Sequence, residues 1–248
     1  MAKAKKGLLL SVLALLFAVT LAATSTYAWF VVNTEVTASN MQVTVKSDTT
    51  YLVISNSSTL GTDTSLALTA ANPKDVLPVK YDASVTPGTG ESKWQTASGT
   101  SYTNGAASTA GYSNVATANL GNYLVSYTFY IGTTNTTAQT ATNLKVKDLN
   151  VTNTAESNPD NTFLNAVSVA FEYDGAIVAN CTNNNGITSL DRAACNAFGT
   201  LVASLTPGTA YEITAHVYIN GDNPVVKSEN AANIATFAVE AIFEVTAG

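Results

Sequence analysis

Residues 163–180, which read FLNAVSVAFEYDGAIVAN, contain the pattern that decides the fold. Two runs rich in β-branched and aromatic residues, 163–173 and 176–180, flank the dipeptide Asp174-Gly175. Both central positions of a two-residue type I′ turn need a positive φ angle, which Asp and Gly tolerate. The stretch therefore predicts a β-hairpin.

Seven further segments predict strands, because their apolar residues recur with period two or form short β-branched runs. Pro207-Gly208 and Asn220-Gly221 mark two more turns. Beyond residue 30 no segment keeps the helical i, i+3, i+4, i+7 spacing over three turns. Nine strands predict an all-β, antiparallel sandwich of jelly-roll-like or immunoglobulin-like type, preceded by an N-terminal hydrophobic signal helix. The seven segments are residues 41–46, 51–55, 123–131, 144–152, 200–204, 211–219 and 234–245.

The composition points outside the cell. The chain has 248 residues, of which 46% are hydrophobic and only 11% charged, while Thr and Asn together supply 61 positions. This balance buries a core and is typical of exported β-rich surface proteins rather than of cytosolic enzymes. The net charge of -6 excludes a nucleic-acid binder, because phosphates require clustered Lys and Arg.

The N-terminus predicts an export signal. Lys3, Lys5 and Lys6 precede an apolar segment at residues 8–23, the order found in secretory signal peptides. Ala28 offers a small residue for cleavage, so a signal peptidase would remove residues 1–28 and the mature, secreted protein would begin at Trp29. We expect an extracellular or cell-surface location.

Two alternatives to cleavage remain open. The uncharged stretch is long enough to be retained as a membrane anchor, since about 20 residues cross a bilayer. A type IV-like pilin would instead be cut between Lys6 and Gly7 and keep its helix for filament packing, although Val12 stands where bacterial pilins carry Glu. In either case, contact with a membrane would depend on the uncleaved N-terminal segment.

Cys181 and Cys195 are the only cysteines, and in an exported chain such a pair predicts a disulfide. Closing this fifteen-residue loop would stabilise the fold by about 3 kcal/mol in the chain-entropy model. The alternative is a pair of free thiols in a reducing environment.

Residues 84–122 differ from the rest of the chain. Gly, Ser, Thr, Ala and Asn dominate there, and Trp94, Tyr102 and Tyr112 are isolated aromatics. A segment of this length predicts a surface insertion with a hairpin, or a flap on the outer face. Its aromatics would either stack on sugars or hold the insertion against the sandwich.

The sequence offers little for catalysis or metal binding. His216 is the sole histidine and lies in an alternating run, and there is no His-Glu-x-x-His or Gly-x-Ser-x-Gly motif. The turns around Asp160 and Asp222 supply oxygen ligands for calcium but lack the spacing of a calcium loop. We therefore expect no enzyme and no cofactor, with calcium at these two turns as a weak alternative.

The junction at residues 25–33, STYAWFVVN, and the following VTASNMQV at residues 36–43 resemble the start of the TasA/camelysin family. A weaker similarity covers residues 216–222 and the closing Phe-containing strand. The resemblance implies release by a dedicated signal peptidase and a jelly-roll-like sandwich that assembles into biofilm-matrix or pilus-like fibres. It also implies that the mature N-terminus of one subunit completes a sheet of its neighbour. The metalloproteinase activity ascribed to camelysin-type proteins does not carry over, because the histidines are missing.

The segment from Trp29 to Val36 supports this expectation physically. Phe30, Val32 and Val36 share one side of an extended chain, so residues 29–40 could add as a donor strand to an exposed sheet edge. Such a head-to-tail contact propagates as a homo-oligomeric filament. The sandwich itself would comprise residues 41–248. One alternative makes residues 29–36 the domain's own first strand, and another makes the protein a monomeric adhesin or glycan-binding sandwich that uses residues 84–122.

Overall fold

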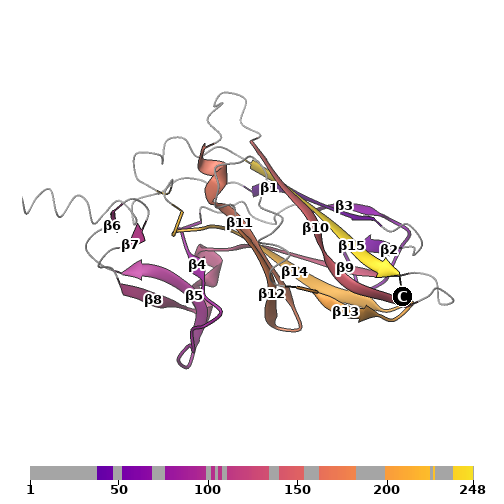
Figure 1. Cartoon of the computed structure of the whole chain (residues 1–248), viewed down its shortest axis with the longest axis horizontal. Helices are drawn as coiled ribbons and strands as arrows, with labels where there is room; N and C mark the ends of the chain where they lie inside the picture. Colours follow the sequence, from indigo (N-terminus) through magenta and orange to yellow (C-terminus); the bar gives the residue numbers. More distant parts are fainter. Residues whose placement is uncertain are drawn as a thin grey trace, which may run out of the picture.

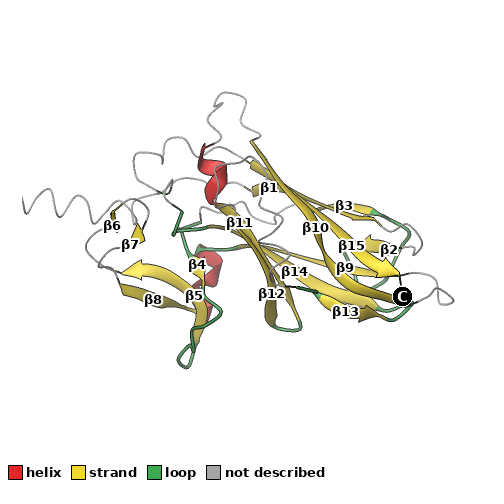
Figure 2. Cartoon of the chain, in the orientation of Figure 1, coloured by secondary structure: helices red, strands yellow, loops and turns green. Residues whose placement is uncertain are grey.

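The computed structural model of the chain describes most residues from Ala38 onward. Within them the chain forms two five-stranded sheets, a three-stranded sheet and a two-stranded ribbon (Figures 1 and 2). The predicted all-β sandwich is confirmed, and the predicted N-terminal helix lies outside the described residues. The described residues are 38–46, 52–68, 76–98, 102–103, 106–107, 111–133, 140–153, 162–182, 199–223, 226 and 237–247.

The first sheet has the strand order β13-β10-β15-β1-β3. Its strands are β1 (Ala38–Lys46), β3 (Ser65–Leu68), β10 (Ala141–Asn153), β13 (Val202–Leu205) and β15 (Phe237–Ala247). β1 and β15 run parallel, with Val45 opposite Phe243, whereas the other pairs of this sheet are antiparallel. The structure differs here from the predicted antiparallel arrangement, because a long connection between two strands leaves their relative direction free.

The second sheet has the order β12-β11-β14-β9-β2. Its strands are β2 (Leu52–Ser55), β9 (Val125–Thr133), β11 (Val167–Tyr173), β12 (Ala176–Thr182) and β14 (Ala210–Ile219). β11 and β12 are joined at Asp174, with φ 52°, and Gly175, with φ 73°. Both angles are positive, as the predicted type I′ hairpin requires.

The two further predicted turns are also present. The Thr209 N–H donates to the Thr206 carbonyl at 3.1 Å across Pro207-Gly208, and Gly208 has φ 78°. Pro at the second and a positive-φ Gly at the third position define a type II turn. The Asn223 N–H likewise donates to the Asn220 carbonyl at 3.0 Å.

The main core lies between the two five-stranded sheets. Every second residue of β9 from Val125 to Ile131 is buried, which is the pattern of a strand with one face on the core. The Phe243 ring of the first sheet lies 5.7 Å from Phe129 and 5.4 Å from Phe171 of the second, measured between ring centroids. All three side chains are fully buried, so these aromatic contacts tie the two layers together.

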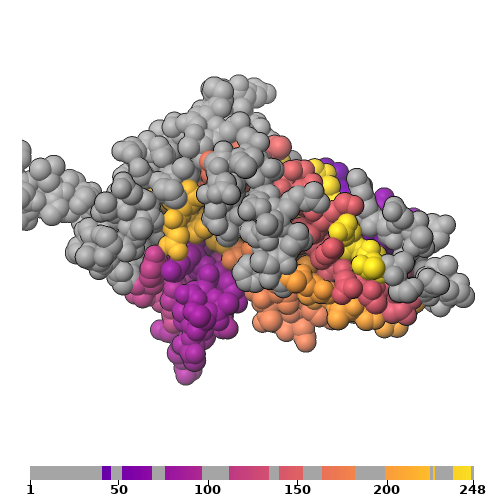
Figure 3. Space-filling view, viewed as in Figure 1, coloured from indigo at the N-terminus to yellow at the C-terminus, as the bar shows by residue number. Residues whose placement is uncertain are grey.

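A third sheet packs on the outer face of the second (Figure 3). It consists of β4 (Lys80–Tyr81), β5 (Glu91–Ser98) and β8 (Gly111–Ala116), followed by the 3₁₀ helix η2 (Thr117–Asn122). In the sequence, β5 and β8 are separated by the two-stranded ribbon of β6 (Tyr102–Thr103) and β7 (Ala106–Ala107). Strands β5 and β8 of the predicted insertion therefore belong to a sheet that makes apolar contacts with the second sheet.

Trp94 on β5 is the anchor of this third sheet. Its side chain is 4% exposed, and its ring lies 4.9 Å from Tyr218 and 5.1 Å from Tyr81. Val79, Val115, Leu124 and Ala170 complete the same buried cluster. Of the two predicted roles for the aromatics, holding the insertion against the sandwich is the one that the structure shows for Trp94.

One predicted strand is shorter than expected. Residues 163–173 were predicted as one strand, but residues Thr162–Ala166 form the 3₁₀ helix η3, and β11 begins at Val167. Leu164 and Ala166 are buried in the same core as the strand residues. An apolar run alone does not distinguish a buried helical turn from a buried strand, which explains the difference.

Candidate functional site

Most of the predicted site residues lie outside the described residues. This holds for the cleavage junction at Ala28 and Trp29, for Cys195 and for Asp160, and for the donor-strand residues Phe30, Val32 and Val36. The structure does describe the last part of the predicted donor range, because β1 begins at Ala38. Ala38 pairs with Phe237 and Asn40 with Ala238, so this part of the chain already belongs to a strand of the first sheet.

β10, the longest strand of the first sheet, pairs over a greater length with β15 than with β13. β13 pairs with β10 only at Ala141, Thr142 and Leu144, whereas β15 pairs with β10 as far as Asn153. Among the described residues, no strand pairs with the Lys145-to-Asn153 part of β10 on the side of β13.

Cys181 lies on β12 and is fully buried in the main core. The described part of the chain contains no free cysteine. Cys195, the predicted partner of Cys181, lies outside the described residues, so the Cys181–Cys195 disulfide stays a prediction. We expect mass spectrometry of the non-reduced mature protein to find a peptide that links the two residues. Alkylation of both cysteines without prior reduction would contradict it.

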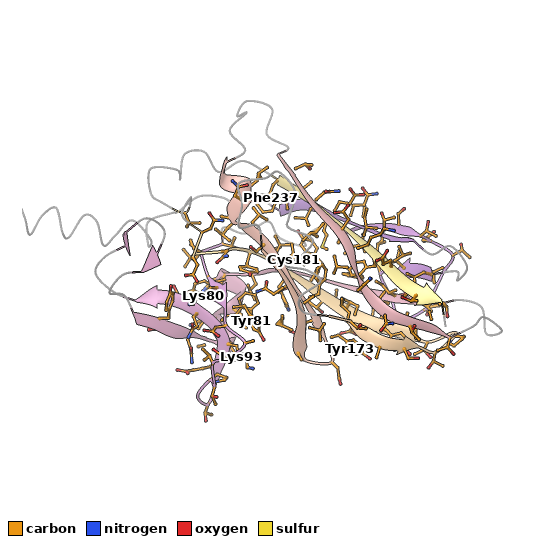
Figure 4. All side chains as sticks on the ribbon, in the orientation of Figure 1. Lys80, Tyr81, Lys93, Tyr173, Cys181 and Phe237 are labelled. Atoms are coloured by element: carbon orange, nitrogen blue, oxygen red, sulfur yellow. The ribbon has the colours of Figure 1, made fainter. Side chains whose placement is uncertain are left out.

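Asp222, one of the two predicted calcium positions, is engaged with the third sheet. Its Oδ1 accepts a hydrogen bond from the Tyr112 hydroxyl at 2.7 Å, and its Oδ2 lies 3.5 Å from Lys80 Nζ. Lys80 Nζ also lies 3.3 Å from the Tyr112 ring centroid, a cation–π contact. Figure 4 shows Lys80 on this sheet, together with Tyr81 and Lys93. No group of three metal-ligating side chains occurs among the described residues.

A polar cluster crosses the outer face of the second sheet. Three neighbouring strands contribute one residue each: Ser126 from β9, His216 from β14 and Glu172 from β11. The Ser126 Oγ lies 2.7 Å from His216 Nδ1, and the Glu172 Oε2 lies 3.1 Å from His216 Nε2. We call these three residues the Ser126 cluster.

The two contacts select one tautomer of the neutral imidazole. A carboxylate only accepts hydrogen bonds, so Nε2 carries the proton and donates to Glu172. Nδ1 of the neutral ring then accepts from the Ser126 hydroxyl. Burial lowers the pKa of His216 below its ordinary value, although the hydrogen bond and the charge of Glu172 oppose this effect. His216 is therefore neutral near pH 7 and able to take up a proton.

The Ser126 cluster lies where the third sheet ends. Tyr218 lies two residues after His216 on β14, and Ala170 lies two residues before Glu172 on β11. Both pack against the third sheet. On the other side, Thr128 and Thr214 share a hydrogen bond of 3.1 Å on an exposed part of the same face. The Trp94 ring lies 6.3 Å from the His216 ring, centroid to centroid. The cluster therefore lies between the Trp94 ring of the third sheet and the exposed polar part of the second sheet that carries Thr128 and Thr214.

The sequence placed His216 on a strand but did not place its partners beside it. Ser126 is 90 residues away and Glu172 is 44 residues away. Only the register of three strands brings them together: His216 is opposite Ser126 on one side and Ala170 on the other. Outward positions of the predicted strands were the available signal, but they do not tell which strands are neighbours.

Two further findings bear on function. Among the described residues, no helix is long and apolar enough to span a membrane. Comparison of the chain with protein-family models, curated proteins and solved structures gave no match in any of the three.

Proposed function

We propose that the chain is the structural subunit of an extracellular filament of the biofilm-matrix or pilus-like kind. In this proposal, the mature N-terminal segment of one subunit adds as a strand to the sandwich of the next. The observation that supports it is the unequal pairing of β10 in the described residues: the register with β13 ends at Leu144, whereas the register with β15 continues to Asn153.

The donor segment and the part of β10 beyond Leu144 agree in length. Trp29 to Val36 comprises eight residues, and the part from Lys145 to Asn153 comprises nine. At about 3.3 Å per residue, each spans roughly 26 to 30 Å. Main-chain hydrogen bonds along such a length provide affinity, and alternate side chains provide specificity.

The core beside this part of β10 is apolar. Val146, Leu149 and Val151 of β10 are at most 3% exposed and face the main core. A donor strand that continues the first sheet would place Phe30, Val32 and Val36 along the same apolar layer. The segment also precedes β1 directly, and a contact between one subunit's N-terminus and the next subunit's side does not close on itself.

Secretion and processing belong to the same proposal. We expect N-terminal sequencing of secreted material to begin at Trp29 or within a few residues, because Ala28 ends the signal-like segment. An intact Met1 in the extracellular form would instead support a membrane-anchored or pilin-like subunit.

Electron microscopy of the purified mature protein tests the assembly. The proposal predicts fibres with an axial repeat of about one domain. Monodisperse monomer under varied salt and pH would contradict it and favour the adhesin or glycan-binding alternative. Trp94 already weakens that alternative, because its buried ring is not available for stacking on a sugar.

A further inference from the structure

We propose that Ser126 is a base-activated nucleophile that accepts acyl groups from small activated esters. The observation behind this inference is the geometry of the Ser126 cluster, which is independent of filament assembly. A hydroxyl, an imidazole and a carboxylate lie in one hydrogen-bonded row, with distances of 2.7 Å and 3.1 Å. This is the arrangement by which an adjacent base, itself oriented by a third group, activates a weak nucleophile.

Each member has the protonation state that its role needs. Ser126 donates to the unprotonated Nδ1 of His216, so the imidazole is in place to remove the hydroxyl proton. Glu172 accepts from Nε2–H and would stabilise the imidazolium that forms on proton transfer. The ring is turned relative to the familiar serine-protease triad, in which Nε2 faces the serine, but whichever ring nitrogen is unprotonated can accept a proton.

The solvent exposure of Ser126 and His216 differs in the way that a nucleophile and its base require. The Ser126 side chain is exposed at the end of the row, while the His216 side chain is 13% exposed. The Trp94 ring lies at an angle of 76° to the imidazole, in a T-shaped arrangement. The nucleophile thus faces solvent, and its base is shielded from competing water on one side.

The chemistry balances without any further cofactor. Ser126 Oγ attacks the ester carbonyl carbon as His216 Nδ1 takes the hydroxyl proton, and the C–O bond to the leaving group breaks. The imidazolium then gives its proton to a departing alkoxide, or to solvent when a stable phenolate leaves as the anion. Water then attacks the acyl-serine while His216 again accepts a proton, which returns to Ser126 Oγ. The products are a carboxylic acid and an alcohol, and the protein is regenerated. Because Ser126 lies on an open sheet face, we assign small aryl esters as the substrate class.

The test uses the mature full chain and p-nitrophenyl acetate. We expect release of p-nitrophenolate and a mass increase of one acetyl group that tandem mass spectrometry places on Ser126. Ser126→Ala should abolish that label. His216→Gln should slow acetylation by about 100- to 10,000-fold, the usual contribution of a general base. Thr128→Ala is the matched control, because Thr128 is a hydroxyl on the same strand and face that bonds to Thr214 instead of His216.

Glu172 is a positioning residue and needs its own readout. Glu172→Gln keeps an oxygen that accepts from Nε2–H but removes the charge, so the fold and the ring orientation should persist while acetylation slows. The ¹⁵N chemical shifts of the His216 imidazole should report the Nε2–H tautomer in the wild type and in Glu172→Gln. The proposal is overturned if folded Ser126→Ala and His216→Gln proteins, checked by circular dichroism, react at the wild-type rate. Acetylation confined to lysines or the N-terminus would also overturn it.

Discussion

A protein that begins at Asn33, or one that carries Phe30→Ser with Val32→Ser, is expected to keep its β-type circular dichroism but to form no fibres. Both changes lie before Ala38, so neither removes a residue that the structure describes in the two five-stranded sheets. Burying a large apolar side chain contributes roughly 1.5 to 3 kcal/mol. Losing two such side chains weakens each subunit contact by roughly 3 kcal/mol or more, a factor above about one hundred in affinity.

A conservative change provides the control for this experiment. Phe30→Leu with Val32→Ile keeps the apolar alternation and should still assemble. Loss of the β-type spectrum in the truncated protein would show that residues 29–36 are an intramolecular strand. Normal fibres from the truncated protein would place the filament contact elsewhere.

Replacing Trp94 with Ala is expected to have the largest effect on the third sheet. The ring is 4% exposed and packs against Tyr81 and Tyr218, so its removal leaves a cavity between two sheets. Truncations of buried Trp typically cost about 3–5 kcal/mol. Because the Trp94 ring contacts both Tyr81 of the third sheet and Tyr218 of the second, we expect local detachment, measured as faster proteolysis within residues 80–116 and a lower melting temperature.

Two variants accompany Trp94→Ala. Trp94→Phe keeps an aromatic ring and should lose much less stability, while Ser113→Ala on the exposed face of β8 should leave stability unchanged. Unchanged proteolysis of Trp94→Ala, together with loss of a sugar-binding activity present in the wild type, would contradict the anchor and restore the glycan platform.

Nine of the ten strands described in the sandwich were predictable because their signal is local, whereas the short edge strand β3 (Ser65–Leu68) was not predicted. Each of the nine predicted segments overlaps a strand of one of the two five-stranded sheets, and the Asp174-Gly175 turn has the predicted geometry. A strand with one buried face needs an alternating sequence, whatever its partners are. The φ angles of a tight turn likewise depend on two residues alone.

The third sheet was predicted only as an insertion with a hairpin. β5 reads ESKWQTAS, with one large apolar side chain among polar ones, and its Gln95 is buried by pairing with Asn114 rather than by its own character. Such a strand forms because β8 and the face of the second sheet are available to it. Strand propensity depends strongly on that context, and the sequence does not show it.

The candidate sites divide in the same way. His216 was predictably a strand residue, but its bonds to Ser126 and Glu172 depend on the order β11-β14-β9, which is not the order of the chain. The unequal pairing of β10 in the described residues follows from the shortness of β13, a strand that lies far from β10 in the sequence. Neither the Ser126 cluster nor the pairing of β10 could be derived from the spacing of residues along the sequence.

The central claim is that residues 29–36 of one subunit pair with the β10 edge of the next, and a cryo-electron microscopy reconstruction of the mature fibres tests it most directly. The account predicts an added strand along Lys145 to Asn153, with Phe30 and Val32 directed into the neighbour's core beside Val146 and Val151. It is contradicted if that segment lies within its own sandwich, or if the subunits meet only through other surfaces and the β10 edge carries no strand from a neighbour.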